Sequence, residues 1–290
     1  AWLKSRHGLG GSGMAIIDNV IKTREDWEKY KGRLTVDFGG TSRIGIESYA
    51  TWWDIEIKDR YLSWSEEKER INRLRKRQKY LLLNVYGPLE ATWRKHGWIR
   101  TIRNIVRNPE FIQDMFNVHT NLVIDTLKRG FKEGIRPDGL FLVEDMAYRH
   151  GPFFSPRTYK ELLLPFHKRI SDFLKANDMG YFVHTDGDIQ PLIPLLIEGG
   201  FDVLQPLQAD LMDVRNLKKE YDCRIAFMGN INARRMSGSK KEIEKEVKSK
   251  ILVAKQGGGY IYHSDHSVPY NISFENYKYT LELVKEYGKY

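Results

Sequence analysis

The chain has 290 residues, of which 41% are hydrophobic, and a formal net charge of +9. That length can bury a large core, either in one barrel-sized domain or in two smaller ones. The single cysteine, Cys223, excludes an intramolecular disulfide and a multi-thiolate metal site within one chain, and it favours a reducing, cytoplasmic location.

The N-terminal stretch "AWLKSRHGLGGSGMAII" lacks the order of a secretory signal and does not begin with Met. We expect residues 1–15 to be a flexible or vector-derived N-terminus and residues 16–290 to form a single domain, and the sequence leaves open that the N-terminus is truncated. No apolar run approaches the ~18–20 residues that cross a bilayer, so no membrane association is expected.

The positive charge by itself suggests nucleic-acid binding. Much of the excess is local, however, because residues 71–80 ("INRLRKRQKY") carry five basic side chains. This run follows "SEEKER" in a helical pattern, where acidic and basic side chains four residues apart form a solvated face. We therefore expect no nucleic-acid partner.

From residue 81 onward, short apolar runs alternate with longer amphipathic segments, which is the pattern of parallel strands covered by helices. The predicted strands are 81–86, 139–145, 180–186, 202–207, 224–230 and 259–265, with 33–38 as a weak seventh. The predicted helices are 109–134, 155–178, 189–200, 212–221, 239–259 and 274–287. This order favours an α/β fold of the (β/α)₈ TIM-barrel type, which needs about 250 residues and eight strands. A doubly wound open sheet is the alternative, and 39–80 is interpreted as an irregular or helical insertion.

Polar side chains follow strand after strand at the carboxyl end, where parallel α/β folds place their sites. They are Tyr86, Glu144, Asp145, His184, Asp186, Gln205, Asn230, His263, Asp265 and His266. We expect these residues to converge on one catalytic or binding surface, with Tyr148 among the nearby aromatic residues.

Glu144 and Asp145 are adjacent, and neighbouring strand residues point to opposite faces, so one of them is expected to face the site. We favour Asp145. Asp188 is interpreted as a cap of the helix that follows it, and Asp186, two positions earlier, as a functional carboxylate. His184, Asp186 and His266 together suit zinc or another divalent metal. Contacts between His and Asp would equally suit a general acid, so both uses stay open.

Four ordered motifs resemble the uroporphyrinogen decarboxylase superfamily, in particular its decarboxylase-like and corrinoid methyltransferase branch. They lie in 143–175, 184–208, 228–232 and 258–277, and "YGPLEATWRKHGW" (86–98) is also similar. The resemblance implies a (β/α)₈ barrel that acts on a tetrapyrrole, corrinoid or folate type of small molecule. It also implies a corrinoid as substrate or as the cofactor of a carrier protein, with a homodimer left open.

Two departures from the family pattern guide the functional hypothesis. The thiol-methylating members hold zinc through a His-x-Cys pair and a later Cys, whereas this chain has His184-Thr185-Asp186, then Asp265 and His266. The Arg-rich N-terminal motif of the decarboxylases is also absent from the sequence. We therefore predict a methyl-transferring enzyme with Asp145, His184, Asp186 and His266 as catalytic residues. Substrate contacts are predicted from Tyr86, Glu144, Tyr148, Gln205, Asn230, His263 and Asp265. The alternatives are decarboxylation of a tetrapyrrole and a catalytically inactive ligand-binding barrel.

Overall fold

The structure is a computed structural model, and it describes residues 3–5, 14–16, 19, 21–36, 63–221 and 223–290. The chain divides into two compact units, which are described separately. Unit 1 comprises residues 1–144, 154–181 and 198–200, and unit 2 comprises residues 145–153, 182–197 and 201–290. Within the described ranges, no helix combines the length and the apolar character needed to cross a bilayer.

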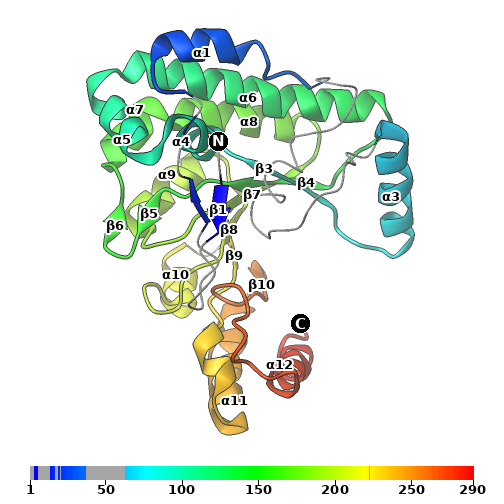
Figure 1. Cartoon of the computed structure of the whole chain (residues 1–290). Coiled ribbons are helices and arrows are strands. Elements are labelled where there is room, and N and C mark those ends of the chain that lie inside the picture. Colours follow the sequence, from blue (N-terminus) through cyan, green and yellow to red (C-terminus); the bar gives the residue numbers. More distant parts are fainter. Residues whose placement is uncertain (1–2, 6–13, 17–18, 20, 37–62, 222) are drawn as a thin grey trace. The chain divides into compact units, whose positions relative to one another are not determined.

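Unit 1 is built around two parallel strands, β3 (Leu82–Tyr86) and β4 (Gly139–Val143). Its helices are α1 (Arg24–Lys31), α3 (Trp64–Lys76), α4 (Pro88–His96), α5 (Trp98–Arg107), α6 (Pro109–Lys132), α7 (Pro156–Leu162) and α8 (Leu164–Lys175). The long helix α6 packs against α4, α5 and α8 (Figure 1). Leu140 and Leu142 of β4 are fully buried, which explains the near-continuous apolar character of this strand. A short strand pair, β1 (Leu3–Ser5) and β2 (Met14–Ile16), is antiparallel.

Unit 2 contains four parallel strands that follow one another in chain order. These are β7 (Gly180–His184, of which 182–184 lie in this unit), β8 (Val203–Gln205), β9 (Ala226–Met228) and β10 (Tyr260–Ile261). Each strand pairs in parallel with the next, and the β7–β8 register places His184 opposite Gln205. A doubly wound sheet reverses its strand order at a switch point. The order from β7 to β10 shows no reversal, as expected for strands wound in one direction in a barrel.

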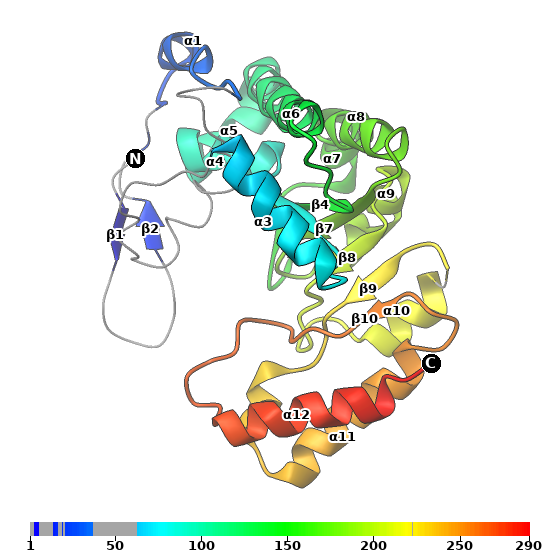
Figure 2. The same ribbon diagram turned by 90° about the vertical axis from the view of Figure 1, so that its right-hand side faces the viewer.

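The remaining elements of unit 2 connect these strands. A hairpin of β5 (Ala147–Tyr148) and β6 (Gly151–Pro152) precedes the strands, and the 3₁₀ turn η1 (Gln190–Leu192) leads into α9 (Ile193–Glu198). After β8 come α10 (Val214–Tyr221), the 3₁₀ segment η2 (Ala233–Ser237), α11 (Lys240–Ala254) and α12 (Phe274–Tyr287). Helices α11 and α12 pack side by side (Figure 2).

The strands predicted after residue 81 and most predicted helices are present, and the differences have local causes. The predicted helix 155–178 is two helices, α7 and α8, that meet at Leu163 and Leu164. Pro165 lacks the backbone N–H that a continuous helix would use at this point. Helices α4 and α5 were not predicted. Residues 33–36 of the weak seventh strand are not a strand, and 37–38 lie outside the described residues, as does 39–62 of the predicted insertion.

The basic run of residues 71–80 begins in α3 and continues past its end at Lys76. Its basic side chains are exposed, and the preceding turn carries an ion pair between Arg70 and Glu67 at 2.5 Å. This matches the solvated helical face that the sequence predicts.

Candidate functional site

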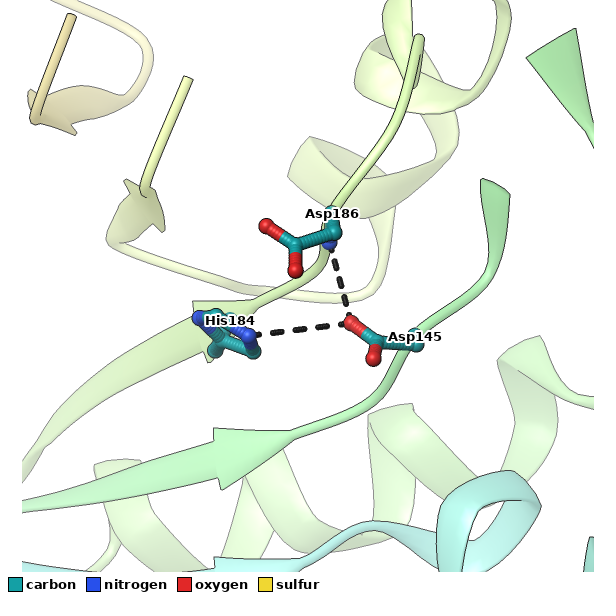
Figure 3. A group of neighbouring side chains, drawn as sticks. All are labelled: Asp145, His184 and Asp186. Carbon is teal, nitrogen blue, oxygen red and sulfur yellow. Dashed lines mark hydrogen bonds and ion pairs between the residues drawn. The ribbon is translucent and has the colours of Figure 1, made fainter. Parts of the chain in front are cut away.

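Three side chains predicted to be catalytic lie together in unit 2. One possible metal-ligand atom from each of Asp145, His184 and Asp186, a carboxylate oxygen or an imidazole nitrogen, lies within 4.8 Å of the other two (Figure 3). His184 Nε2 is 3.7 Å from Asp145 Oδ1, and the same oxygen accepts a hydrogen bond of 3.0 Å from the backbone N–H of Asp186. The side chains of His184 and Asp145 are 20% and 29% exposed, so the group is accessible but not fully solvated. We call these three residues the Asp145–His184–Asp186 cluster.

The local sequence brings the two segments of the cluster together. Met146 donates its backbone N–H to Thr185 Oγ1 at 3.0 Å, and Asp188 donates its backbone N–H to Tyr148 O at 2.9 Å. Gly187 lies between these contacts with φ +89°, and a Cβ there would lie 2.5 Å from Ala147 C and Tyr148 N. Only glycine allows this backbone conformation and this approach without strain. The segment that follows β4 and the segment that follows β7 are thus held edge to edge.

Burial and neighbouring charges change the pKa of Asp186, the second carboxylate of the cluster. Burial raises the pKa of Asp186, and the nearby Asp145 acts in the same direction, while His184 and His266 oppose the shift. The side chain of Gln208 donates a weak hydrogen bond to Asp186 Oδ1 at 3.4 Å and accepts one from Gly187 N at 3.3 Å. A proton or a cation between the carboxylates would relieve their repulsion.

A chain of polar side chains leads away from His184. Its Nδ1 is 2.5 Å from Gln205 Oε1, and Gln205 Nε2 is 3.4 Å from His263 Nδ1. His263 Nδ1 is also 2.5 Å from the carbonyl oxygen of Ser264. Gln205, predicted to bind substrate, therefore contacts His184 at Nδ1 and not at Nε2, the nitrogen near Asp145, and Gln205 links His184 to His263.

Two other predicted substrate-binding residues hold the backbone instead. Asn230 is fully buried, donates to the carbonyl oxygens of Leu207 and Met212, and accepts from Val214 N. The carboxylate of Asp265 is nearly buried and accepts from Ala209 N and Ala233 N. These hydrogen bonds give both side chains a role in holding the backbone, and their predicted substrate contacts stay predictions.

The remaining predicted site residues of unit 2 are His266 and Tyr148. His266 is exposed, its Nδ1 accepts a hydrogen bond from Ser267 N at 2.8 Å, and it does not belong to the group of close donor atoms. Asp145 stands in the place where the sequence predicted His266 as a third metal ligand. Tyr148 is 49% exposed and stacks on Phe153 at 5.5 Å, so its predicted substrate contact stays open.

Glu144 and Tyr86 belong to unit 1. Glu144 is fully buried and accepts hydrogen bonds from the backbone N–H groups of Leu89 and Glu90, in the first turn of α4. His167 Nε2 is 3.1 Å from Glu144 Oε1, and His167 Nδ1 is 2.8 Å from the Tyr159 hydroxyl. The carboxylate of Glu144 is thus held within unit 1, and its predicted substrate contact stays a prediction.

Tyr86 lies at the end of β3, where the Arg94 guanidinium stacks over its ring at 4.2 Å. Arg94 also forms an ion pair with the buried Glu90 at 2.6 Å. The structure therefore describes Tyr86 as part of an aromatic and cationic group of unit 1, and its predicted substrate contact stays a prediction.

Sequence reasoning missed the residues that support the predicted ones. Thr185 and Gly187 join the two segments of the cluster, Gln208 bonds to Asp186 and Gly187, and His167 and Tyr159 enclose Glu144. Gly187 carried a usable signal, because a glycine between two aspartates after a strand marks a tight turn. The others are ordinary polar residues whose partners are distant in the sequence.

The residues of the cluster fit a divalent metal ion. Two carboxylates and one imidazole form an oxygen and nitrogen donor set, which suits zinc and harder divalent ions. Nδ1 of His184 is engaged by Gln205, so Nε2 is the nitrogen that faces the carboxylates. Cys223, the only cysteine, is exposed and lines a separate cavity with Lys218 and Arg224, so it adds no thiolate to this site.

These features define an α/β protein with parallel strands and a polar cluster on the segments that follow two of them. The family model described as uroporphyrinogen decarboxylase (URO-D) matches residues 91–287, more than half of the chain. The chain belongs to the uroporphyrinogen decarboxylase family, and the predicted superfamily and (β/α)₈ barrel class are confirmed.

One curated relative and one solved structure are also similar to this chain. A uroporphyrinogen decarboxylase from Thermodesulfovibrio yellowstonii is 24% identical over 191 residues, which cover 66% of this chain and 53% of the relative. A methyltransferase from Methanosarcina mazei matches with a TM-score of 0.61 and 14% identity, over 76% of this chain and 64% of that protein. The chain thus spans about half the length of the curated relative, and the likeness to the methyltransferase structure shows the fold alone.

Proposed function

We propose that this protein catalyses a methyl transfer in which a corrinoid or a folate takes part. We also propose that the Asp145–His184–Asp186 cluster holds a divalent cation for that reaction. The observation that carries the proposal is the convergence of the three donor atoms within 4.8 Å. A bound cation would act as a Lewis acid that lowers the pKa of an acceptor group bound to it, so that the group loses its proton and attacks the methyl carbon while the bond to the methyl donor breaks. The chain's own residues would fix the cation through Asp145, Asp186 and His184 Nε2. The methyl group would come from a corrinoid, free or on a carrier protein, or from a folate.

The charge of the cluster supports methyl transfer over decarboxylation of a tetrapyrrole. A substrate with several carboxylates needs cationic side chains, whereas this cluster presents two carboxylates. Among the described residues of unit 2, Arg215 and Arg234 form ion pairs with Asp213 and Asp210. Tetrapyrrole decarboxylation stays the second candidate, because the family and the curated relative carry that name, and Asp186 with its raised pKa would supply an acid.

Metal content and ligand variants test the cation. We expect purified protein to hold about one divalent ion per chain by elemental analysis. A metal ligand contributes more to cation affinity than the residues that support it. We therefore expect His184→Ala and Asp186→Asn each to weaken cation binding by at least about 100-fold. Asp188→Asn is the matched control, since Asp188 accepts from Gln190 N and lies outside the cluster. Equal affinity in Asp186→Asn and Asp188→Asn would reject the cation site.

Turnover assays separate the three functions. Methyl transfer from methylcobalamin to tetrahydrofolate, lost in His184→Ala and retained in Asp188→Asn, would support the proposal. Release of CO₂ from uroporphyrinogen without methyl transfer would replace it with the decarboxylase. Tight methylcobalamin binding with neither activity would indicate the inactive ligand-binding barrel.

A further inference from the structure

The geometry points to Gln205 as a positioning residue that sets the tautomer of His184. It leaves the lone pair on Nε2, the ring nitrogen that faces the cluster. The inference rests on the proposed cation site, and it assigns Gln205 a role in building that site instead of the substrate contact predicted from the sequence. Gln205 is 5% exposed, and the strand register fixes it opposite His184.

The contact between the two side chains sets the tautomer of the imidazole. A carbonyl oxygen can only accept a hydrogen bond, so the 2.5 Å separation from Gln205 Oε1 requires a hydrogen on His184 Nδ1. In a neutral ring the lone pair then lies on Nε2. Nε2 is the nitrogen that lies 3.7 Å from Asp145 Oδ1. Gln205 thus presents His184 to the cluster as a metal ligand and not as a hydrogen-bond donor.

The orientation of the Gln205 amide decides this outcome. If the amide were reversed, its NH₂ group would face Nδ1, and the hydrogen of the ring would move to Nε2. The contact with His263 favours that reversal. His263 Nδ1 carries a hydrogen, because it donates to Ser264 O, and Gln205 Nε2 is also a donor, so the two groups cannot form a hydrogen bond with each other. The His184 contact favours the orientation described, because a separation of 2.5 Å suits a ring N–H donating to an oxygen and is too short for two nitrogens facing each other. The His263 contact is 3.4 Å long and opposes this orientation only weakly.

A carboxylate at position 205 would remove the conflict, because it can accept from both imidazoles. We therefore expect Gln205→Glu to keep the Nδ1–H tautomer of His184 and to bind a cation at least as tightly as the natural protein. Gln205→Leu removes the acceptor, so the ring can place its hydrogen on Nε2. Loss of such a supporting residue lowers metal affinity by about 10- to 100-fold.

The experiment combines two measurements on the same proteins. Nitrogen NMR of the metal-free protein reports the His184 tautomer, with the signals assigned by comparison with His184→Ala. Calorimetric titration with Zn²⁺ reports affinity. Gln190→Leu is the matched control, because Gln190 is exposed and its side chain donates a hydrogen bond to Asp188, which lies outside the cluster. We expect Nδ1–H in the natural protein, in Gln205→Glu and in the control, with a shift toward Nε2–H and 10- to 100-fold weaker Zn²⁺ binding in Gln205→Leu.

The outcomes distinguish this inference from the proposed function. An Nε2–H tautomer in the natural protein, or an unchanged tautomer and Zn²⁺ affinity in Gln205→Leu, would overturn the role of Gln205. An Nδ1–H tautomer that Gln205→Leu abolishes would support that role. If the natural protein then failed to bind Zn²⁺ or any other divalent ion, the cation site alone would be rejected. Measuring the natural protein first keeps the inference testable even if Gln205→Leu does not fold.

Discussion

Glu144 and Asp145 are consecutive residues with the same charged group, yet they belong to different units and have different surroundings. Glu144 lies in unit 1 with no exposed surface, and it accepts from two backbone N–H groups and from His167. Asp145 lies in unit 2, is 29% exposed, and shares its neighbourhood with His184 and Asp186.

The difference shows how surroundings assign a role to a carboxylate. Backbone donors at the start of α4 stabilise the negative charge of Glu144 and fix the end of β4 to that helix. Asp145 instead lies beside a second carboxylate and an imidazole and is partly exposed to solvent. The first carboxylate is held by backbone and side-chain donors of unit 1, whereas the second is open to a ligand, as the proposed cation site needs.

Truncating the two carboxylates should give the largest contrast. We expect Glu144→Ala to lower the free energy of unfolding by about 3–5 kcal/mol, because it leaves three buried donors without their acceptor. Asp145→Ala should cost less than about 1 kcal/mol, since solvent can replace its contacts. Urea unfolding of both variants measures this difference. Equal losses would show that the two carboxylates do not have different roles.

Gly187 allows a second test within unit 2, because its lack of a side chain lets the two segments of the cluster approach each other closely. Gly187→Ala should destabilise the protein by roughly 1–3 kcal/mol, since the new Cβ would overlap Ala147 C and Tyr148 N. Gly258→Ala is the control, because its φ of +84° matches the +89° of Gly187 but a Cβ there meets no atom within 4 Å.

The cation affinity of the same two glycine variants provides the functional measurement. Gly187→Ala should also weaken Zn²⁺ binding, because the segment carrying His184 and Asp186 must move away from Asp145. Gly258→Ala should leave it unchanged. A Gly187→Ala variant as stable as Gly258→Ala would show that the close approach of the two segments is not required.

The smallest effect is a pH dependence of stability in unit 1. Burial lowers the pKa of His119 well below its ordinary value of 6.5. The unfolded chain therefore takes up a proton below about pH 6.5 while the folded state does not, so this residue lowers stability as the pH falls. Between pH 7 and 5.5 its contribution should be about 1.2 kcal/mol.

Replacing His119 should remove that contribution. The His119→Leu variant is expected to lose less stability between pH 7 and 5.5 than the natural protein, as measured by urea unfolding at both values. Met115→Leu, another buried position on α6, is the control and should keep the natural pH dependence. Parallel pH profiles for all three proteins would contradict the prediction.

Much of the fold was predictable because its signals are local. The apolar runs of β4 and β7 and the amphipathic helices α6, α11 and α12 follow from hydrophobic periodicity and from caps such as Ser239 and Ser273. Helices α4 and α5 were missed, although Pro88 begins α4 and Gly97 separates the two helices. Neither helix has an N-cap side chain that accepts a hydrogen bond, so the usual N-cap signal was missing at both.

The candidate site was predictable in position but not in membership. Residues at the carboxyl ends of parallel strands were predicted to lie close together, and Asp145, His184 and Asp186 do so. Asn230 and Asp265 were predicted as substrate contacts, because residue type and strand position cannot show whether backbone N–H and C=O groups will bond to their polar atoms. Those hydrogen bonds come from segments that are distant in the sequence.

The sequence by itself determined the class of this protein: parallel strands separated by helices, family motifs over most of the chain, and polar residues after each strand. These features depend on the period of apolar residues and on the chemistry of turns, which act over a few residues. Only the tertiary structure decided that Asp145 lies beside His184 and Asp186, that Glu144 is enclosed by His167 and α4, and that Gln205 contacts the His184 ring. Those outcomes depend on which donors and acceptors meet when distant segments pack, and no local pattern encodes that meeting.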